Sequence, residues 1–154
     1  MTAIGLQGGV GLLSRRRRHW PMEEPIPTDV LELLRERVGS LEQLEALLLL
    51  HREATRAWSL DEVAERLSLP VDMLEAELAA LVAAGLLAVE QRRWTYAPHD
   101  ARSAEIVARL AVLYPVRRLE VLRLLSDLAM QRIRGSAARA FADSFVIGRR
   151  KKDG

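Results

Sequence analysis

The chain has 154 residues, of which 49% are hydrophobic, 5% aromatic and 29% charged, and its formal net charge is +2. A chain of this length supports one core with short appendages, and its many alanines, leucines, arginines and glutamates favour helices. The absence of cysteine excludes disulfides, thiolate catalysis and cysteine zinc sites.

Other kinds of chemistry are equally hard to place on this sequence. The three histidines, His19, His51 and His99, do not have the spacing of metal ligands. No motif brings together a nucleophile, a base and an orienting group, and no nucleotide-binding signature is present. We therefore expect neither an enzyme nor a bound cofactor. No uninterrupted apolar run is long enough to cross a bilayer, so we expect a cytoplasmic protein without a membrane span.

Charge is distributed unevenly along the chain. Residues 28–98 carry thirteen acidic and seven basic side chains, whereas residues 99–154 carry six acidic and twelve basic ones. Residues 1–27 combine several glycines and prolines with a run of arginines, which predicts a disordered basic N-terminal arm. This arm is either a plain flexible tail, or a mis-assigned start, or a segment that contacts phosphates or an acidic partner.

The ordered part is expected to begin with two helices between residues 28 and 52. The first has apolar residues at Val30, Leu33 and Leu34. The second is capped by Ser40 and is apolar on most sides through the run that ends at Leu50. Helices of this kind are usually buried, so the second helix is predicted to form the floor beneath the elements that follow.

Residues 58–97 read as helix, turn, helix and a two-stranded ribbon. Ser59 and Glu62 form a capping box that begins the first helix, and Ser68-Leu69-Pro70 ends it. The second helix has leucines at helical spacing and ends at Gly85, a typical C-terminal glycine. Two strands with alternating apolar residues then follow, and residues 90–93 turn the chain between them.

This order of caps and apolar positions resembles the winged helix-turn-helix superfamily, which includes bacterial transcription regulators. The matching stretch runs from Trp58-Ser59-Leu60 through Asp61–Leu67 and Leu69–Leu81 to Gly85-Leu86-Leu87. The resemblance implies a mainly α fold, with a winged-helix domain at residues 28–98, a small β-ribbon wing and a C-terminal helical extension. It specifies the partner poorly, because winged helices bind DNA, RNA and proteins.

In a winged helix, residues 71–84 would be the recognition helix. Its exposed side is predicted to carry Asp72, Glu75, Ala76 and Ala79, without the arginine, lysine, asparagine or glutamine that reads base edges. The candidate DNA contacts therefore lie elsewhere: Gln91, Arg92 and Arg93 in the wing, and Arg15, Arg16, Arg17, Arg18, Arg149, Arg150, Lys151 and Lys152 in the two arms. The alternative for the wing arginines is a solvated turn, and for the arms it is solubility.

Residues 99–134 form a C-terminal helical region. A helix is expected to break at Tyr114-Pro115, and a second one to begin at Pro115 with a broad apolar face. We expect this face to form a homodimer interface through Leu119, Leu122, Leu125 and Leu128, although folding back onto its own subunit is the alternative.

Gly135-Ser136 is expected to end that helix, which leaves residues 135–154 as a short amphipathic helix with a basic tail. Phe141 and Phe145 lie on one face of it, either docked on their own domain or free to enter a partner's groove.

The sequence thus favours a DNA-associated transcriptional regulator that binds mainly through its wing and basic arms. The alternative is a protein-interaction adaptor that uses Asp72, Glu75, Ala76 and Ala79 of the second helix, together with Phe141 and Phe145.

Overall fold

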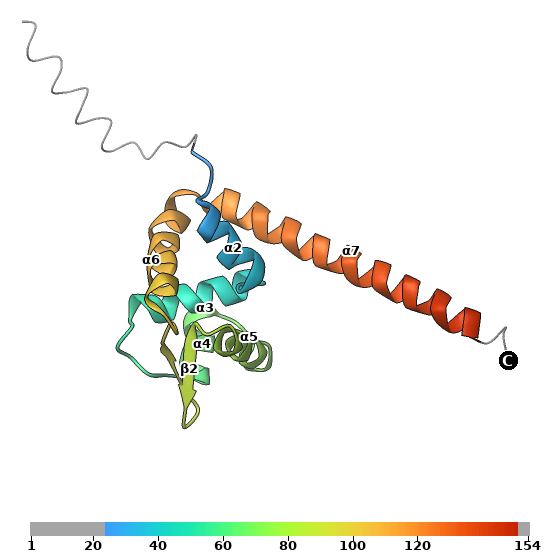
Figure 1. Ribbon diagram of the computed structural model, residues 1–154. Helices are drawn as coiled ribbons and strands as arrows, with labels where there is room; N and C mark the ends of the chain where they lie inside the picture. The colour runs from blue at the N-terminus through green and yellow to red at the C-terminus, as the bar shows by residue number, and fades with distance from the viewer. Residues whose placement is uncertain (1–23, 151–154) are drawn as a thin grey trace, which may run out of the picture.

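The computed structural model describes residues 24–150, and it describes side chains as far as residue 146. Its elements are α2 (Thr28–Glu36), α3 (Leu41–Arg52), β1 (Trp58–Ser59), α4 (Leu60–Leu67), α5 (Val71–Ala83), β2 (Leu87–Glu90), β3 (Arg93–Tyr96), α6 (Ala101–Val116) and α7 (Arg118–Arg150). Figure 1 shows α2 to α6 gathered into one body, the β-ribbon projecting from one end, and α7 leaving the body as a long arm. The mainly α fold and the winged helix predicted from the sequence are confirmed.

The helix-turn-helix begins at the capping box. The Ser59 hydroxyl accepts from the Glu62 amide at 3.2 Å, and the Glu62 carboxylate accepts from the Ser59 amide at 2.8 Å. Helix α4 ends at Ser68, which has φ 54 in the left-handed region, and Pro70 stands directly before α5. After α5 the chain turns at Gly85, whose φ of 73 is open to glycine without strain. These predicted helix limits are confirmed.

The sheet has three antiparallel strands in the order β1-β3-β2, where the sequence predicted two. Strand β1 is two residues long and pairs Trp58 with Trp94. On the other side of β3, Val89 also pairs with Trp94. The capping Ser59 is itself extended, with φ −78 and ψ 161, so Trp58 and Ser59 pair with β3 while the Trp58 side chain enters the core. The sheet joins the wing to the helix-turn-helix directly.

The core is centred on α3. Its residues Leu44 and Ala46 to Leu50 are all buried, as the sequence predicted for a floor helix. Leu74, Leu78 and Leu81 of α5 pack into the same cluster with no exposed surface. Each such leucine contributes about 1.5–3 kcal/mol relative to an exposed one. Helix α5 is therefore held against α3 with its opposite face to solvent.

The predicted break at Tyr114-Pro115 is wrong by two residues. Pro115 lies inside the last turn of α6, which continues to Val116, and the chain leaves the helix at Arg117 with φ −120 and ψ 36. Proline fixes φ near its helical value but has no backbone N–H, so it removes one helical hydrogen bond, and a final turn tolerates this better than a helix centre does. The Arg117 carbonyl then accepts the Val121 amide and begins the next helix.

The predicted helix end at Gly135-Ser136 is also wrong, because α7 continues unbroken for 33 residues. Glycine in a helix interior costs only about 1 kcal/mol relative to alanine, and the alanines that follow are the strongest helix formers. The expected boundary between residues 134 and 135 therefore falls within one helix.

Within residues 24–150, no helix is both long enough and apolar enough to cross a membrane.

Candidate nucleic-acid interface

The outer face of α5 is acidic and apolar. Asp72, Glu75, Ala76 and Ala79 are all exposed, as predicted from the leucine spacing. Glu77 is half-buried and accepts a hydrogen bond from the Ser40 hydroxyl at 3.1 Å. Carboxylates on this face repel a phosphate backbone, and alanines offer no hydrogen bond to a base edge. The helix that usually reads sequence is therefore poorly suited to do so here.

The wing ends in a two-residue loop, Gln91-Arg92, because Glu90 and Arg93 are the last pair of the ribbon. Both loop residues have positive φ, 50 for Gln91 and 58 for Arg92, as a type I′ hairpin turn requires. Gln91, Arg92 and Arg93 are exposed at the projecting end of the ribbon seen in Figure 1. The structure thus brings together the three predicted wing residues at one tip.

Further arginines gather at the base of the wing, and the sequence reasoning did not identify them. Arg56 lies 3.2 Å from Glu53 and 3.4 Å from Glu62, while Arg66 lies 3.1 Å from Glu53. The Arg56 guanidinium also stacks over the Trp58 ring, 3.8 Å from its centroid. These residues all lie between Glu53 and Arg66, but they come from the end of α3, the loop before β1, and α4, so the pattern of a single helix or strand does not reveal the base cluster.

Glu62 connects the base cluster to the wing and to α4. The Ser59 amide that donates to its carboxylate lowers the pKa of Glu62, and Arg56 and Arg93 lower it further. Arg93 is 3.9 Å from Glu62 and its side chain is 57% exposed, so this ion pair is loose and solvated. An anion near the wing would meet Arg93 with little competition from Glu62.

A second group missed at sequence level fixes how α5 is held against α6. The Arg37 guanidinium donates to the Ala84 carbonyl at 2.9 and 2.6 Å and to the Ser103 hydroxyl at 2.8 Å. His99 Nδ1 lies 3.2 Å from the same guanidinium. Gly85 has a positive φ of 73, which disfavours other residues, and a Cβ at this position would come within 2.8 Å of His99 Nδ1. For both reasons the turn requires glycine. These contacts span 47 to 66 residues of sequence, beyond the reach of any local pattern.

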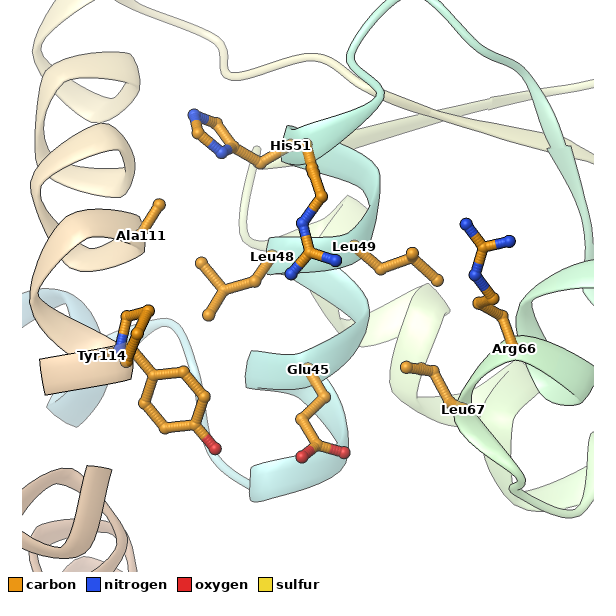
Figure 2. Close-up of a pocket in the computed structure, with 10 residues that line it drawn as sticks. Glu45, Leu48, Leu49, His51, Arg66, Leu67, Ala111 and Tyr114 are labelled. Carbon is orange, nitrogen blue, oxygen red and sulfur yellow. The ribbon is translucent and has the colours of Figure 1, made fainter.

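A cavity of about 590 Å³ lies between α3, α4 and α6. In Figure 2 Leu48 points toward Tyr114 and Ala111, whereas Leu49 points toward Leu67 and Arg66. Among the residues whose side chains are described, the buried Tyr114 hydroxyl has no hydrogen-bond partner, and burial raises its pKa. Apolar walls with a few polar groups are the usual lining of small-molecule sites. This cavity was not predicted from the sequence, because its walls come from separate helices.

His51 is at the edge of the same cavity, near the end of α3. Its ring meets the Tyr96 ring edge-on, with centroids 5.1 Å apart. Burial lowers the pKa of His51, because the charged imidazolium is less well solvated there. The His51 ring, which lies between the helical body and β3, therefore favours its neutral form.

The residues predicted for the dimer interface divide into two sets. Leu125 and Leu128 are buried in their own subunit, while Leu122 is half-buried and Leu119 is 71% exposed. The first half of α7 thus folds back onto the body, as the alternative interpretation had it. Leu125 and Leu128 are already covered, so they are not free surface.

Phe141 and Phe145 lie far along α7, exposed at 67% and 64%. Their rings pack edge-on with centroids 4.8 Å apart. The interpretation in which they dock on their own domain does not hold, because the arm carries them away from the body (Figure 1). Arg149 and Arg150 belong to the last turn of α7, and their side chains lie outside the described part. Arg15 to Arg18, Lys151 and Lys152 lie outside the described residues altogether.

Comparison with known proteins finds no matching family model and no matching curated protein. Solved structures that are similar include a MarR family protein of Mycobacterium tuberculosis, Rv2887, at 20% identity and a TM-score of 0.42, covering 91% of this chain and 88% of that one. MepR, a transcription regulator of the Staphylococcus aureus multidrug efflux pump MepA, is similar at 10% identity and a TM-score of 0.44, covering 89% and 97%. On the geometry of its own elements, with α4 and α5 as the helix pair and β2 and β3 as the wing, this chain is a winged helix-turn-helix protein.

Proposed function

We propose that this protein is a cytoplasmic transcription regulator that binds DNA mainly through its wing and works as a homodimer. The observation that carries the proposal is the wing tip, where Gln91 and Arg92 occupy a left-handed two-residue turn with Arg93 beside them. A narrow minor groove attracts arginine through its strong negative potential. A thin ribbon with two exposed arginines at its end has the shape and charge to enter one.

The role of α5 in this proposal is to support the wing and not to read bases. Asp72 and Glu75 would weaken binding in the major groove, since both would face phosphates. Binding should therefore depend strongly on salt and weakly on sequence. The basic arms, with Arg15 to Arg18 at one end and Arg149 to Lys152 at the other, would add phosphate contacts, and a homodimer would double them.

The test is a salt titration of binding to a short mixed-sequence duplex, followed by fluorescence anisotropy between about 50 and 200 mM salt. Each lost phosphate contact lowers the salt slope by about 0.9. Arg92→Ala/Arg93→Ala should therefore weaken binding and reduce the slope by about 2. Asp72→Ala/Glu75→Ala should leave the slope unchanged.

The matched control is Arg102→Ala/Arg139→Ala, which removes the same charge from two exposed positions on α6 and α7. If this control weakens binding as much as the wing variant does, the effect is general charge and the wing is not the contact. Absence of binding by the unmodified protein would overturn the proposal.

A second function, a protein-interaction adaptor, is favoured by one observation. Beside its acidic residues, α5 exposes Val71 at 41% and Met73 at 48%, a mixture suited to a basic and partly apolar partner. The same variants discriminate between the two functions. Loss of a protein partner with Asp72→Ala/Glu75→Ala, and not with Arg92→Ala/Arg93→Ala, would favour the adaptor.

A further inference from the structure

Helix α7 leaves the body part way along its length. Arg132 is the last residue tied to the body, through hydrogen bonds to the carbonyls of Gly39 at 2.8 Å and Arg35 at 3.0 Å. From Ile133 to Val146 every residue except Gly135 is exposed. A free helical arm of this kind is marginal in water, because most helical stability in proteins comes from packing of an apolar face.

The outward side of α7 carries an apolar stripe along almost its full length. The exposed Arg123 and Ser144 lie in the same sector, so this side is mostly and not wholly apolar. Leu119, Ser126, Met130, Ile133, Ala137 and Phe141 lie within about 40° of one line at 3.6 residues per turn. We call this set the outer stripe. Leu119, Met130, Ile133 and Phe141 are 71%, 48%, 62% and 67% exposed, while the buried Val121, Leu125 and Leu128 are on the opposite side of the helix. The stripe thus continues from the part that rests on the body into the free arm.

The residues of the outer stripe match those of a second, antiparallel copy of α7. Leu119 and Phe141 lie eleven residues before and after Met130, about 16 Å each way along the helix. If two copies of α7 run antiparallel with Met130 on the two-fold axis, Leu119 meets Phe141 of the partner subunit, and Ile133 packs beside Met130 of the partner subunit. A two-fold interface requires this reciprocity, in which each contact occurs twice.

Charges beside the stripe agree with the same register. Asp127 and Arg134 are exposed on one flank of the outer stripe, and neither forms an ion pair among the residues whose side chains are described. In the antiparallel pair, residues on the same flank face each other, so Asp127 lies beside Arg134 of the partner subunit, twice. A parallel pair would instead set this flank against the opposite flank of the partner subunit, and would keep Asp127 apart from Arg134.

We infer that the outer stripe of α7 binds a second copy of this chain as an antiparallel helix pair centred on Met130. This inference specifies the interface of the homodimer in the proposed function. It rests on that proposal only for the number of subunits, which is two. It replaces Leu125 and Leu128 with Met130, Ile133 and Phe141 as the contact residues. It also places the two winged helices toward opposite ends of the paired helices.

Because the chain has no cysteine, single-cysteine variants of the full chain report the arrangement directly. With a short bismaleimide cross-linker, Met130→Cys should cross-link to itself. Leu119→Cys and Phe141→Cys should each fail alone, since two copies of either are about 33 Å apart in this register, and should cross-link when the two variants are mixed. Self-cross-linking of Leu119→Cys or Phe141→Cys would indicate a parallel pair and overturn the inference.

Light scattering on uncross-linked protein provides the second measurement. Ile133→Glu should convert the dimer to a monomer, whereas Val146→Glu, at an equally exposed position on the opposite side of α7 (60% against 62%), should leave it dimeric. Asp127→Arg should weaken the dimer, and Asp127→Arg/Arg134→Asp should restore it. Equal effects of the two glutamates, or a monomeric unmodified protein that sediments with lipid vesicles, would overturn the inference. DNA binding is measured separately, so a monomer that still shows the wing-dependent salt slope would leave the DNA-binding proposal standing.

Discussion

Replacing Arg37 with methionine tests how α5 and the turn after it are held against α6. Methionine keeps an unbranched apolar stem of similar length but removes the guanidinium. The Ala84 carbonyl at the end of α5 then loses two donors, and the Ser103 hydroxyl loses one. Hydrogen bonds to a charged group contribute about 1.5–3 kcal/mol each. If each of the two acceptors loses one such hydrogen bond at the lower value, Arg37→Met should lower the free energy of unfolding by about 3 kcal/mol.

Urea denaturation followed by circular dichroism measures this difference, and a thermal melt should show a midpoint lower by roughly 10 °C for a chain of this size. Arg35→Met is the matched control, because Arg35 is an exposed residue of α2 two positions before Arg37, which caps the end of that helix, and surface substitutions usually change stability by less than about 0.5 kcal/mol. If the two variants unfold within 1 kcal/mol of each other, roughly the value of one ordinary hydrogen bond, Arg37 does not hold this junction. Protection of the Gly85 amide from hydrogen exchange, lost in Arg37→Met alone, would localise the effect.

Three further predictions concern stability. Ser59→Ala removes the cap of α4 and should cost about 1 kcal/mol in urea denaturation, with no loss in Ser126→Ala, an exposed serine on α7, as the contrast. Leu78→Ala, at a position with no exposed surface, should cost about 2–5 kcal/mol, and a smaller cost would mean that the α3–α5 contact is loose. Burial lowers the pKa of His51, because the folded protein disfavours the charged imidazolium. The contribution of neutral His51 to the free energy of unfolding is therefore complete above its usual pKa near 6.5 and is lost as the pH falls below that value. The melting temperature should therefore fall on acidification through this range, less steeply in His51→Gln, and an unchanged profile in that variant would contradict the assignment.

The helix-turn-helix was predictable because its signals are local. The capping box at Ser59 and Glu62, the proline before α5 and the glycine after it each act within one turn of chain. The wing followed from alternation of apolar residues on either side of a short polar turn. These features determine element type and limits before any tertiary contact forms.

Features that depend on distant segments were missed or misplaced. Strand β1 is only two residues long, and Trp58 pairs with Trp94 across a whole helix pair. Arg37 finds its acceptors in α6 and after α5, and no spacing in the sequence indicates them. Gly135 and Pro115 are breakers by local preference, but each costs little where it stands. The burial of Leu125 and Leu128 depends on where α7 lies, which helical periodicity alone does not determine.

The wing tip shows that its sequence is not the best one for folding. For L-residues other than glycine, asparagine and aspartate, the left-handed conformation costs about 1–2 kcal/mol each, and both Gln91 and Arg92 adopt it. An Asn-Gly pair is the usual solution for this hairpin. Replacing Gln91-Arg92 by Asn-Gly should therefore yield a sturdier domain that has lost one of its two tip cations. Such a variant would separate what the ribbon needs for its shape from what it presents to another molecule.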